Sequence, residues 1–292
     1  MKYAFIRSHS AGYRVEVFCR VLGVSRQGYY AWCKRPESAR SRDDRRLAAR
    51  VRIVHAESKS RYGSPRVHAT LREEGIRCGE KRVARLMQYE GLRAKAGRKF
   101  KATTDSHHDR PLSPDLVRRE FTAPAPNRVW VGDITYLWTA EGWLYLAVFI
   151  DLFSRRVVGW AVSTRITAHL VTLALARAIA RRRPGAGLIV HTDRGAQYGA
   201  ERYRRALAAI QALQSMGSTG DCYDNAACES FFHSFKVEAV HGEDLVTRRE
   251  MEYEVFDYIE HFYNKKRKHS ALGFRSPEQF ETEQQRQQKA TA

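Results

Sequence analysis

Residues 188–198 read LIVHTDRGAQY, and the fold can be argued outward from this stretch. Leu188, Ile189 and Val190 form a short apolar run rich in β-branched side chains, which is typical of a buried strand. The Arg-Gly pair at residues 194–195 is expected to end the strand in a turn. The carboxylate of Asp193 is therefore predicted at the tip of a buried strand.

A second acid follows in residues 224–235, which read DNAACESFFHSF. Phe232 and Phe235 stand three and six residues after Glu229, a spacing that gives a helix an aromatic face toward the core. Asp224 and Asn225 are candidate caps at the start of this helix, and a metal-site role for Asn225 is the alternative. The second carboxylate is thus predicted on a helix.

A third acid lies in residues 130–138, WVGDITYLW, where the residues alternate as in a strand. Trp130, Ile134, Tyr136 and Trp138 fall on one strand face, and Asp133 falls on the other. Burying one carboxylate costs several kcal/mol, and three carboxylates can gather only where a cation or a proton offsets their repulsion. Three acids on two strands and a helix suit two divalent hard metal ions, which can clamp the attacking and leaving oxygens of a phosphoryl transfer.

The spacing and the text around these acids resemble one known family. Exactly 35 residues separate Asp193 from Glu229, and Lys236 stands seven residues after Glu229. This arrangement resembles the D, D, 35, E pattern of retroviral-integrase-like transposases, and in particular the integrase-like second reading frame of the insertion-sequence-three family. The matching segments are WVGDITY (130–136), IDLFSRRVVGW (150–160), HTDRGAQY (191–198), CYDNA (222–226) and YNKKRKHSALG (263–273).

The resemblance implies an α/β fold with a ribonuclease H-like catalytic domain, a mixed five-stranded sheet with helices, preceded by an all-α helix-turn-helix region. In that fold the first and fourth strands are neighbours, which brings Asp133 and Asp193 together. It further implies a DNA transposase in which Asp133, Asp193 and Glu229 are catalytic and hold two Mg²⁺ ions, with Mn²⁺ as a substitute. Lys236 would contact DNA near the scissile phosphate; a solvated or salt-bridged lysine is the alternative.

Four segments are predicted along the 292 residues. They are a helical DNA-binding region with two helix-turn-helix-like units (1–95), a basic linker (96–127), the catalytic core with its C-terminal helix (128–281) and a disordered tail (282–292). Within the core, strands are predicted at 129–138, 143–153, 155–163, 187–192 and 211–217, and helices at 168–183, 201–210 and from Thr247 to about Asn264. Asp151, at the end of the second strand, is assigned a turn or hydrogen-bonding role.

The N-terminal region should meet DNA first. Residues 1–120 carry 29 Lys and Arg against 13 Asp and Glu, net +16, whereas residues 121–292 carry 22 against 19, net +3. So uneven a split predicts a polyanionic partner and a salt-dependent affinity. Ser25 is a candidate cap for a helix over residues 26–34, which would present Arg26, Gln27 and Tyr30 to phosphates or base edges; a helical hairpin that only packs on its neighbours is the alternative.

A second helical pair follows, with Ser64 and Pro65 as N-cap and first helical residue and Gly91 after the last turn. This pair resembles the second helix-turn-helix of the family, in which Arg82 and Arg85 would contact DNA. A solvated basic face is the alternative. The linker adds a basic patch at 98–101 and a histidine pair at 107–108, for which a solvated role is favoured over metal binding.

The apolar runs and the cysteines of the sequence bear on where in the cell the protein is expected. No run of 18 or more apolar residues and no signal-peptide core occur, which predicts a chain that is neither membrane-bound nor exported. Cys19, Cys33, Cys78, Cys222 and Cys228 are odd in number and lack CxxC spacing, which favours reduced thiols. The expected location is the bacterial cytoplasm, with nucleoid association when the protein holds DNA.

The resemblance implies double-stranded DNA partners, namely the terminal inverted repeats of an element and a target duplex. Synapsis of two ends implies a homo-multimer, and in this family the chain is often fused to, or paired with, a small upstream-frame product. Two rival functions share part of these features. A ribonuclease H-like nuclease or resolvase would share the acids, and a non-catalytic DNA-binding regulator would share the basic N-terminal half.

Overall fold

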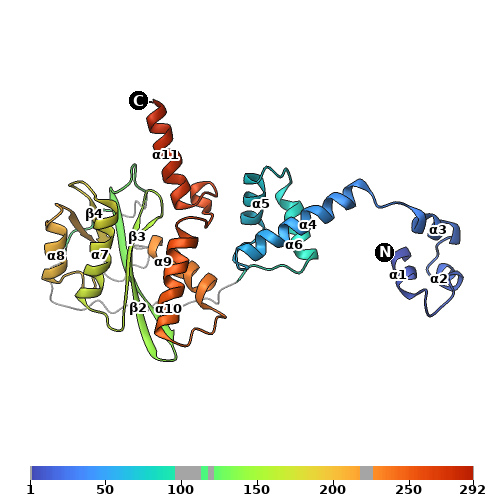
Figure 1. Cartoon of the computed structure of the whole chain (residues 1–292), viewed down its shortest axis with the longest axis horizontal. Coiled ribbons are helices and arrows are strands. Elements are labelled where there is room, and N and C mark those ends of the chain that lie inside the picture. The colour runs from blue at the N-terminus through green and yellow to red at the C-terminus, as the bar shows by residue number, and fades with distance from the viewer. Residues whose placement is uncertain (1, 96–112, 118–121, 218–225, 292) are drawn as a thin grey trace.

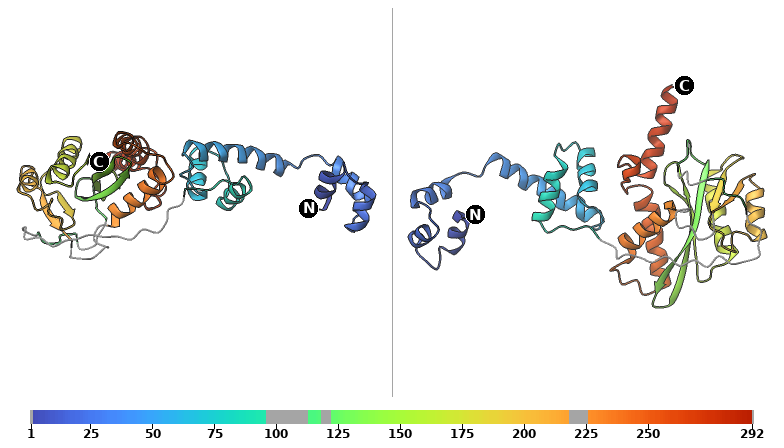
Figure 2. Two further views of the ribbon diagram at one scale, coloured as in Figure 1. Left: turned by 90° about the horizontal axis from the view of Figure 1, so that it is seen from below. Right: turned by 180° about the vertical axis from the view of Figure 1, so that it is seen from behind.

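The structure, a computed structural model, describes residues 2–95, 113–117, 122–217 and 226–291. The described elements form three bodies arranged along one long axis (Figure 1). The N-terminal helices lie at one end, a second group of helices lies in the middle, and the sheet with its covering helices lies at the other end. The two further views in Figure 2 show the same order.

The first body is a three-helix unit. It consists of α1 (Lys2–His9), α2 (Val15–Val21) and α3 (Arg26–Lys34). A small core of Ile6, Cys19 and Tyr29 holds it together, one residue from each helix. The Ser25 hydroxyl accepts a hydrogen bond from the Gly28 amide at 3.0 Å, which confirms the predicted cap of α3. Sequence reasoning did not find α1.

The second body consists of α4 (Ala39–Glu57), α5 (Ser64–Glu73) and α6 (Glu80–Tyr89). Pro65 lies in the first turn of α5, although the N-cap is Gly63 and Ser64 is already helical. Gly91 has a φ of +68°, the left-handed conformation expected of a glycine that follows a helix. The apolar stripes of these helices join the large hydrophobic cluster that continues into the sheet domain, so the two bodies pack together.

Polar contacts fix the same junction between the second body and the sheet domain. Arg61 donates to the Glu238 carbonyl at 3.0 Å and to the Glu254 carboxylate at 3.0 Å. The Tyr62 hydroxyl donates to the carbonyl of Lys266 at 2.9 Å. Because Arg61 and Tyr62 are both buried, these bonds are shielded from water and tie the loop before α5 to the sheet domain.

The third body is built on a five-stranded mixed sheet. Its strands are β1 (Val129–Thr139), β2 (Gly142–Asp151), β3 (Val157–Ser163), β4 (Ile189–Thr192) and β5 (Leu213–Met216). The order is β3-β2-β1-β4-β5, with β1 to β3 an antiparallel meander and β4 and β5 added in parallel. The predicted fold class is confirmed, including the pairing of the first and fourth strands.

Helices cover both faces of this sheet. On one face lie α7 (Ala168–Arg182) and α8 (Glu201–Ala208), which pack with Trp130 and Val190. The other face is covered by α9 (Ala226–Phe235) and by α10 (Arg248–Phe256), which continues as a π-helix over Asp257–Tyr263. Figure 1 shows α7 and α8 on one side of the strands and α9 and α10 on the other.

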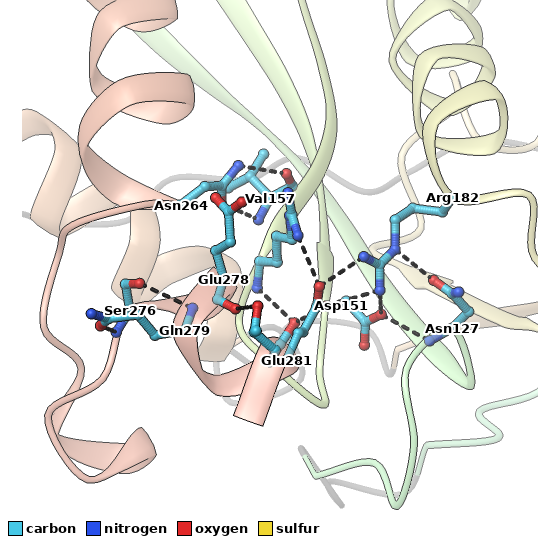
Figure 3. A network of polar contacts seen from close by, with 12 residues as sticks. Asn127, Asp151, Val157, Arg182, Asn264, Ser276, Glu278, Gln279 and Glu281 are labelled. Atoms are coloured by element: carbon cyan, nitrogen blue, oxygen red, sulfur yellow. Dashed lines mark hydrogen bonds and ion pairs between the residues drawn. The ribbon is translucent and has the colours of Figure 1, made fainter. Parts of the chain in front are cut away.

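The C-terminal helix α11 (Pro277–Thr291) departs from the prediction, because residues 282–291 are helical where a disordered tail was expected. Its anchor is Glu281, a buried carboxylate that accepts bonds from Ser154, Arg156 and Arg182 (Figure 3). Arg182 also pairs with Asp151 at 3.3 Å. These partners come from a β-turn and from the end of α7, which periodicity cannot assign to a distant glutamate.

Candidate active site

Asp133 and Asp193 are brought together by the pairing of two parallel strands. Gly132 of β1 is opposite Thr192 of β4, and each aspartate is the next residue along its chain. Each carboxylate is also oriented by its own backbone. Oδ1 of Asp133 accepts the Ile134 amide at 2.7 Å, and Oδ1 of Asp193 accepts the Gly195 amide at 2.9 Å.

Gly132 and Gly195 each allow a close approach beside an acid. A Cβ added to Gly132 would lie 2.4 Å from the ring of Phe149, which is fully buried. A Cβ added to Gly195 would lie 2.2 Å from the Gln197 amide nitrogen and 2.9 Å from Oδ1 of Asp193. The glycines in the two motifs therefore leave room for the core under β1 and for the turn that orients Asp193.

Glu229 joins them from the helix. α9 packs on β1, where the buried thiol of Cys228 lies 3.7 Å from the carbonyl oxygen of Val131. Phe232 and Phe235 are buried on the core face, as predicted, which leaves Glu229 exposed at the surface of the helix. Burial of the surrounding region still raises the pKa of the Glu229 carboxyl.

The negative charges of Asp193 and Glu229 both act on the carboxyl of Asp133. Burial and, to a smaller extent, the negative charges of Asp193 and Glu229 together raise the pKa of Asp133 to about 8, against the opposing effects of the Ile134 amide and of Lys236. Burial also raises the pKa of the Tyr198 hydroxyl, and the charges of Asp193 and Asp133 add to that shift. Asp193 and Glu229 thus repel a negative charge on Asp133, and a bound cation would offset this repulsion.

Lys236 supplies a nearby positive charge. It begins a π-helix, Lys236–Val240, directly after α9, and its charge acts on Asp133. Burial lowers the pKa of the Lys236 ammonium, and the Asp133 carboxylate partly restores it.

Among the described residues, no three His, Cys, Asp or Glu side chains are yet arranged closely enough to enclose a metal ion. The donor chemistry nevertheless fits a hard divalent cation, because the three groups are carboxylates and Asp133 and Asp193 each use one oxygen for a backbone amide. Glu229 is the exposed member of the set.

Other residues singled out from sequence lie elsewhere. Burial and the charges of Arg267, Arg66 and Arg155 lower the pKa of His269, in the YNKKRKHSALG segment, to about 2, and this residue lies among the arginines rather than the acids. Asp151 accepts the amides of Asn127 and Phe153, in keeping with its assigned role at a turn. Asn225, the 98–101 patch and the 107–108 histidine pair lie outside the described residues.

Apart from Lys236, the predicted DNA-contacting residues fall on α3 and α6. Arg26, Gln27 and Tyr30 are exposed on α3, and Arg26 forms only a 3.4 Å exposed ion pair with Glu16. Arg82 and Arg85 of α6 are instead paired with acids of α4. Arg82 contacts Asp43 and Asp44, and Arg85 contacts Asp44 at 2.8 Å. The aspartates were visible in the sequence, but their distance along the chain concealed the pairing.

Comparisons with known proteins match this architecture. Residues 123–222 and 229–284 each match a family model described as an integrase core domain, and residues 41–100 match an HTH-like domain. No helix among the described residues is long and apolar enough to cross a membrane.

Two similar solved structures are a chain of a simian T-cell lymphotropic virus intasome in complex with a PP2A regulatory subunit and the HTLV-2 integrase catalytic core in complex with magnesium. The first has 16% identity and a TM-score of 0.47, covering 80% of this chain and 74% of that one. The second has 17% identity and a TM-score of 0.41, covering 54% and 98%.

Curated relatives extend over almost the whole chain. An uncharacterized 31 kDa protein of insertion element IS600 from Shigella sonnei is 43% identical, covering 90% of this chain and 96% of that protein. Transposase InsF for insertion sequence IS3A from Escherichia coli is 48% identical over 283 residues, covering 96% of this chain and 98% of that protein. With its integrase core and HTH-like region, this chain belongs to the IS3 family of insertion-sequence transposases.

Proposed function

We propose that this transposase cuts DNA at the ends of its insertion sequence and joins the released 3′-hydroxyl to a target phosphodiester, with Asp133, Asp193 and Glu229 as its catalytic residues. The observation that carries the assignment is the electrostatic coupling of the three carboxyl groups, expressed in the pKa of Asp133 near 8. Such strongly perturbed acids are typical of catalytic sites.

The acids are proposed to hold two Mg²⁺ ions, for which Mn²⁺ can substitute. Bound there, the ions supply activation of the attacking water or 3′-hydroxyl and neutralisation of the leaving oxygen. Asp133 and Asp193 provide the fixed ligands, since backbone amides orient both carboxylates. Glu229 would complete the set from α9. No protein group forms a covalent bond with DNA in this scheme.

Lys236 is proposed to contact a DNA phosphate beside the acids. Its ammonium is close enough to Asp133 to act on that carboxyl, and a phosphate placed there would share the same positive charge. DNA held by this lysine and by the metal ions would keep the scissile bond in line for attack.

Recognition of the element ends is assigned to the helical regions. Arg26, Gln27 and Tyr30 present polar and charged groups on one exposed helix, suited to a DNA groove. Arg82 and Arg85 are proposed to contact phosphates once they leave Asp43 and Asp44. The protein is proposed to act in the bacterial cytoplasm on double-stranded terminal repeats and target DNA, as a homo-multimer, fused to or paired with a small upstream-frame product.

The test compares wild-type protein with the Asp193→Asn variant on a pair of duplexes that carry the inverted repeats with exposed 3′-hydroxyl ends. With Mg²⁺, the wild type is expected to form joined strands, and the variant is expected to bind the ends equally well without forming product. Cutting without joining by the wild type would favour a ribonuclease H-like nuclease. Absence of both reactions, with end binding retained, would favour a DNA-binding regulator.

A further inference from the structure

A basic cavity lies next to the proposed active site, on the neighbouring side of α9. It has a volume of about 340 Å³. Its walls come from four separate parts of the chain: α5, the turn between β2 and β3, α9, and the end of the π-helix over Asp257–Tyr263 with the segment that follows it. The lining residues are Arg66, Arg155, Ala226, Ala227, Ser230, Ser234, Tyr263, Arg267, His269, Ser270 and Ala271.

The described side chains that line the cavity carry a net positive charge. Among the described lining residues, three are arginines and none is an acid. The carboxylate of Glu238 lies behind the wall, where it pairs with Arg267 at 2.7 Å and with Arg66 at 3.2 Å. One carboxylate therefore serves two guanidinium groups, and the cavity keeps an excess of positive charge.

Hydrogen-bond donors remain available in the wall. Arg66 uses Nε for the Lys268 carbonyl and Nη1 for Glu238, and Arg267 uses Nε and Nη2 for Glu238 and Ser234. Among the described residues, these bonds leave Nη2 of Arg66 and Nη1 of Arg267 for other partners. The hydroxyls of Ser230 and Ser270 stand on the exposed rim.

His269 is a second, independent indication of a ligand. Its Nε2 atom is buried and has no hydrogen-bond partner within the described part of the chain. Its ring is held edge-on against Tyr263, with centroids 4.9 Å apart. A buried polar atom without a partner is costly, and the cost is removed when a ligand accepts its hydrogen bond. A neutral imidazole protonated at Nε2 would donate to an anion in the cavity.

From these features we propose that the cavity binds a backbone phosphate of a DNA strand that leaves the active site. Arginine forks, hydroxyls and a histidine N–H are the donors that a phosphate oxygen prefers. Ser230 directly follows Glu229 on α9, so a phosphate seated here would lie beside the helix that carries a proposed catalytic acid. The inference rests on the proposed transposase function and adds a strand-positioning site to it.

The cavity also joins two bodies of the protein. Arg66 belongs to α5 of the HTH-like region, whereas Ser230 and Ser234 belong to α9 of the integrase core. A bound phosphate would thus be contacted by the end-recognition region and by the helix that carries Glu229. Occupation of the cavity is expected to fix the path of the strand between the two regions.

The experiment places a negative charge on the rim without touching the proposed catalytic residues. Ala271→Asp and, independently, Ser270→Asp are made in the full chain, because both side chains are exposed. Ala208→Asp, an exposed position on α8 across the sheet, is the matched control. Binding of a fluorescent 30-base-pair duplex is measured at several salt concentrations without Mg²⁺, so that no chemistry is required, and thermal unfolding confirms that each variant is folded.

Loss of one phosphate contact is expected to reduce the slope of log affinity against log salt by about 0.9 in both rim variants, and to leave it unchanged in Ala208→Asp. Inorganic phosphate is the second probe. A thermal stabilisation of the wild type by inorganic phosphate, abolished in the rim variants while their DNA salt slope stays at the wild-type value, would assign the cavity to a free phosphate and overturn the proposal.

An unchanged slope in both rim variants overturns the proposal as well. If the wild type still joins DNA ends in Mg²⁺ in that case, only the cavity assignment fails. If the wild type binds DNA but joins no ends, the proposed reaction is wrong and the strand-positioning site is retained. If the wild type binds no DNA, both the proposed reaction and the strand-positioning site are wrong.

Discussion

Arg82 of α6 donates to Asp44 of α4, with Nε 2.6 Å from the carboxylate, and Arg85 contacts the same aspartate. Two cations of a predicted DNA-reading helix are thus partly neutralised by one acid. The two arginines in turn lower the pKa of the Asp44 carboxyl. DNA that approaches α6 must compete with Asp44 for both guanidinium groups.

Replacing Asp44 with Asn is therefore expected to strengthen DNA binding. The substitution removes the competing charge, so we expect the affinity for a duplex at low salt to increase about three- to tenfold. Fluorescence anisotropy measures the change. Glu252→Gln, which removes a charge from an exposed position on α10, serves as the control. Weaker binding by Asp44→Asn would mean that Asp44 orients the arginines for DNA.

The raised pKa of Asp133 predicts how stability depends on pH in the absence of metal. An acid whose pKa is raised to about 8 in the folded protein holds a proton that the unfolded chain has released, so it makes stability fall between about pH 4 and pH 8. Asp133→Asn removes this penalty. The melting temperature of the variant is expected to exceed that of the wild type increasingly as pH rises from 5 to 8.

Mg²⁺ is expected to offset the negative charge of Asp133 and so to stabilise the folded protein. At pH 8 in calorimetry, added Mg²⁺ is expected to raise the melting temperature of the wild type and to have little effect on Asp133→Asn, because binding to the folded state alone stabilises it. Equal stabilisation of both proteins by Mg²⁺ would place the metal away from Asp133.

Removing the Glu238 carboxylate is expected to reduce the stability of the folded protein strongly. It is buried and accepts bonds from Arg66, Arg267 and Tyr258. Burial raises its pKa, but the bonds and charge of Arg267 outweigh burial and hold the pKa below its usual range. Glu238→Ala leaves Arg267 buried without its partner, which costs about 3–5 kcal/mol. Urea denaturation measures the loss, and Glu252→Ala is the exposed control.

The Glu238 carboxylate also makes the stability of the folded protein depend on pH in the acid range. Because its folded pKa is lowered, Glu238 contributes stability above the unfolded pKa, and this contribution is lost as pH falls through the folded value. The difference in stability between the wild type and Glu238→Gln should therefore shrink as pH falls below about 4. A difference that is constant from pH 7 to pH 3 would contradict this.

Replacing Gly132, the residue before Asp133, with alanine is expected to cause a steric clash. Alanine there would place its Cβ 2.4 Å from the ring of Phe149, so the buried ring or the strand must move. Overpacking of this kind typically costs about 1–3 kcal/mol. Gly185→Ala, where an added Cβ meets nothing within 4 Å, is the control. Unfolding of both variants by urea should show a loss only for Gly132→Ala.

Sequence patterns predicted the sheet and the acidic trio because those features depend on local periodicity and on a fixed spacing. Asp193 was placed by the apolar run before it, and Glu229 by the phenylalanines after it. The adjacency of β1 and β4 came from resemblance, since strand order is a matter of long-range packing that alternation does not encode.

What the sequence missed was decided by contacts between distant segments. The pairing of Arg82 with Asp44 joins two helices, and the residues around His269 come from four parts of the chain. Helix α11 was missed because its sequence is mostly polar, and its order depends on Glu281 meeting Arg156 and Arg182.

That anchor has a practical consequence for anyone who shortens or extends the polypeptide. In Figure 1 the end of α11 points away from the sheet, so a purification tag added after residue 292 is carried clear of the strands. A stop codon placed before Glu281 would instead leave the partly buried guanidinium groups of Arg156 and Arg182 without their shared acid, and would put the whole domain at risk of precipitation during expression.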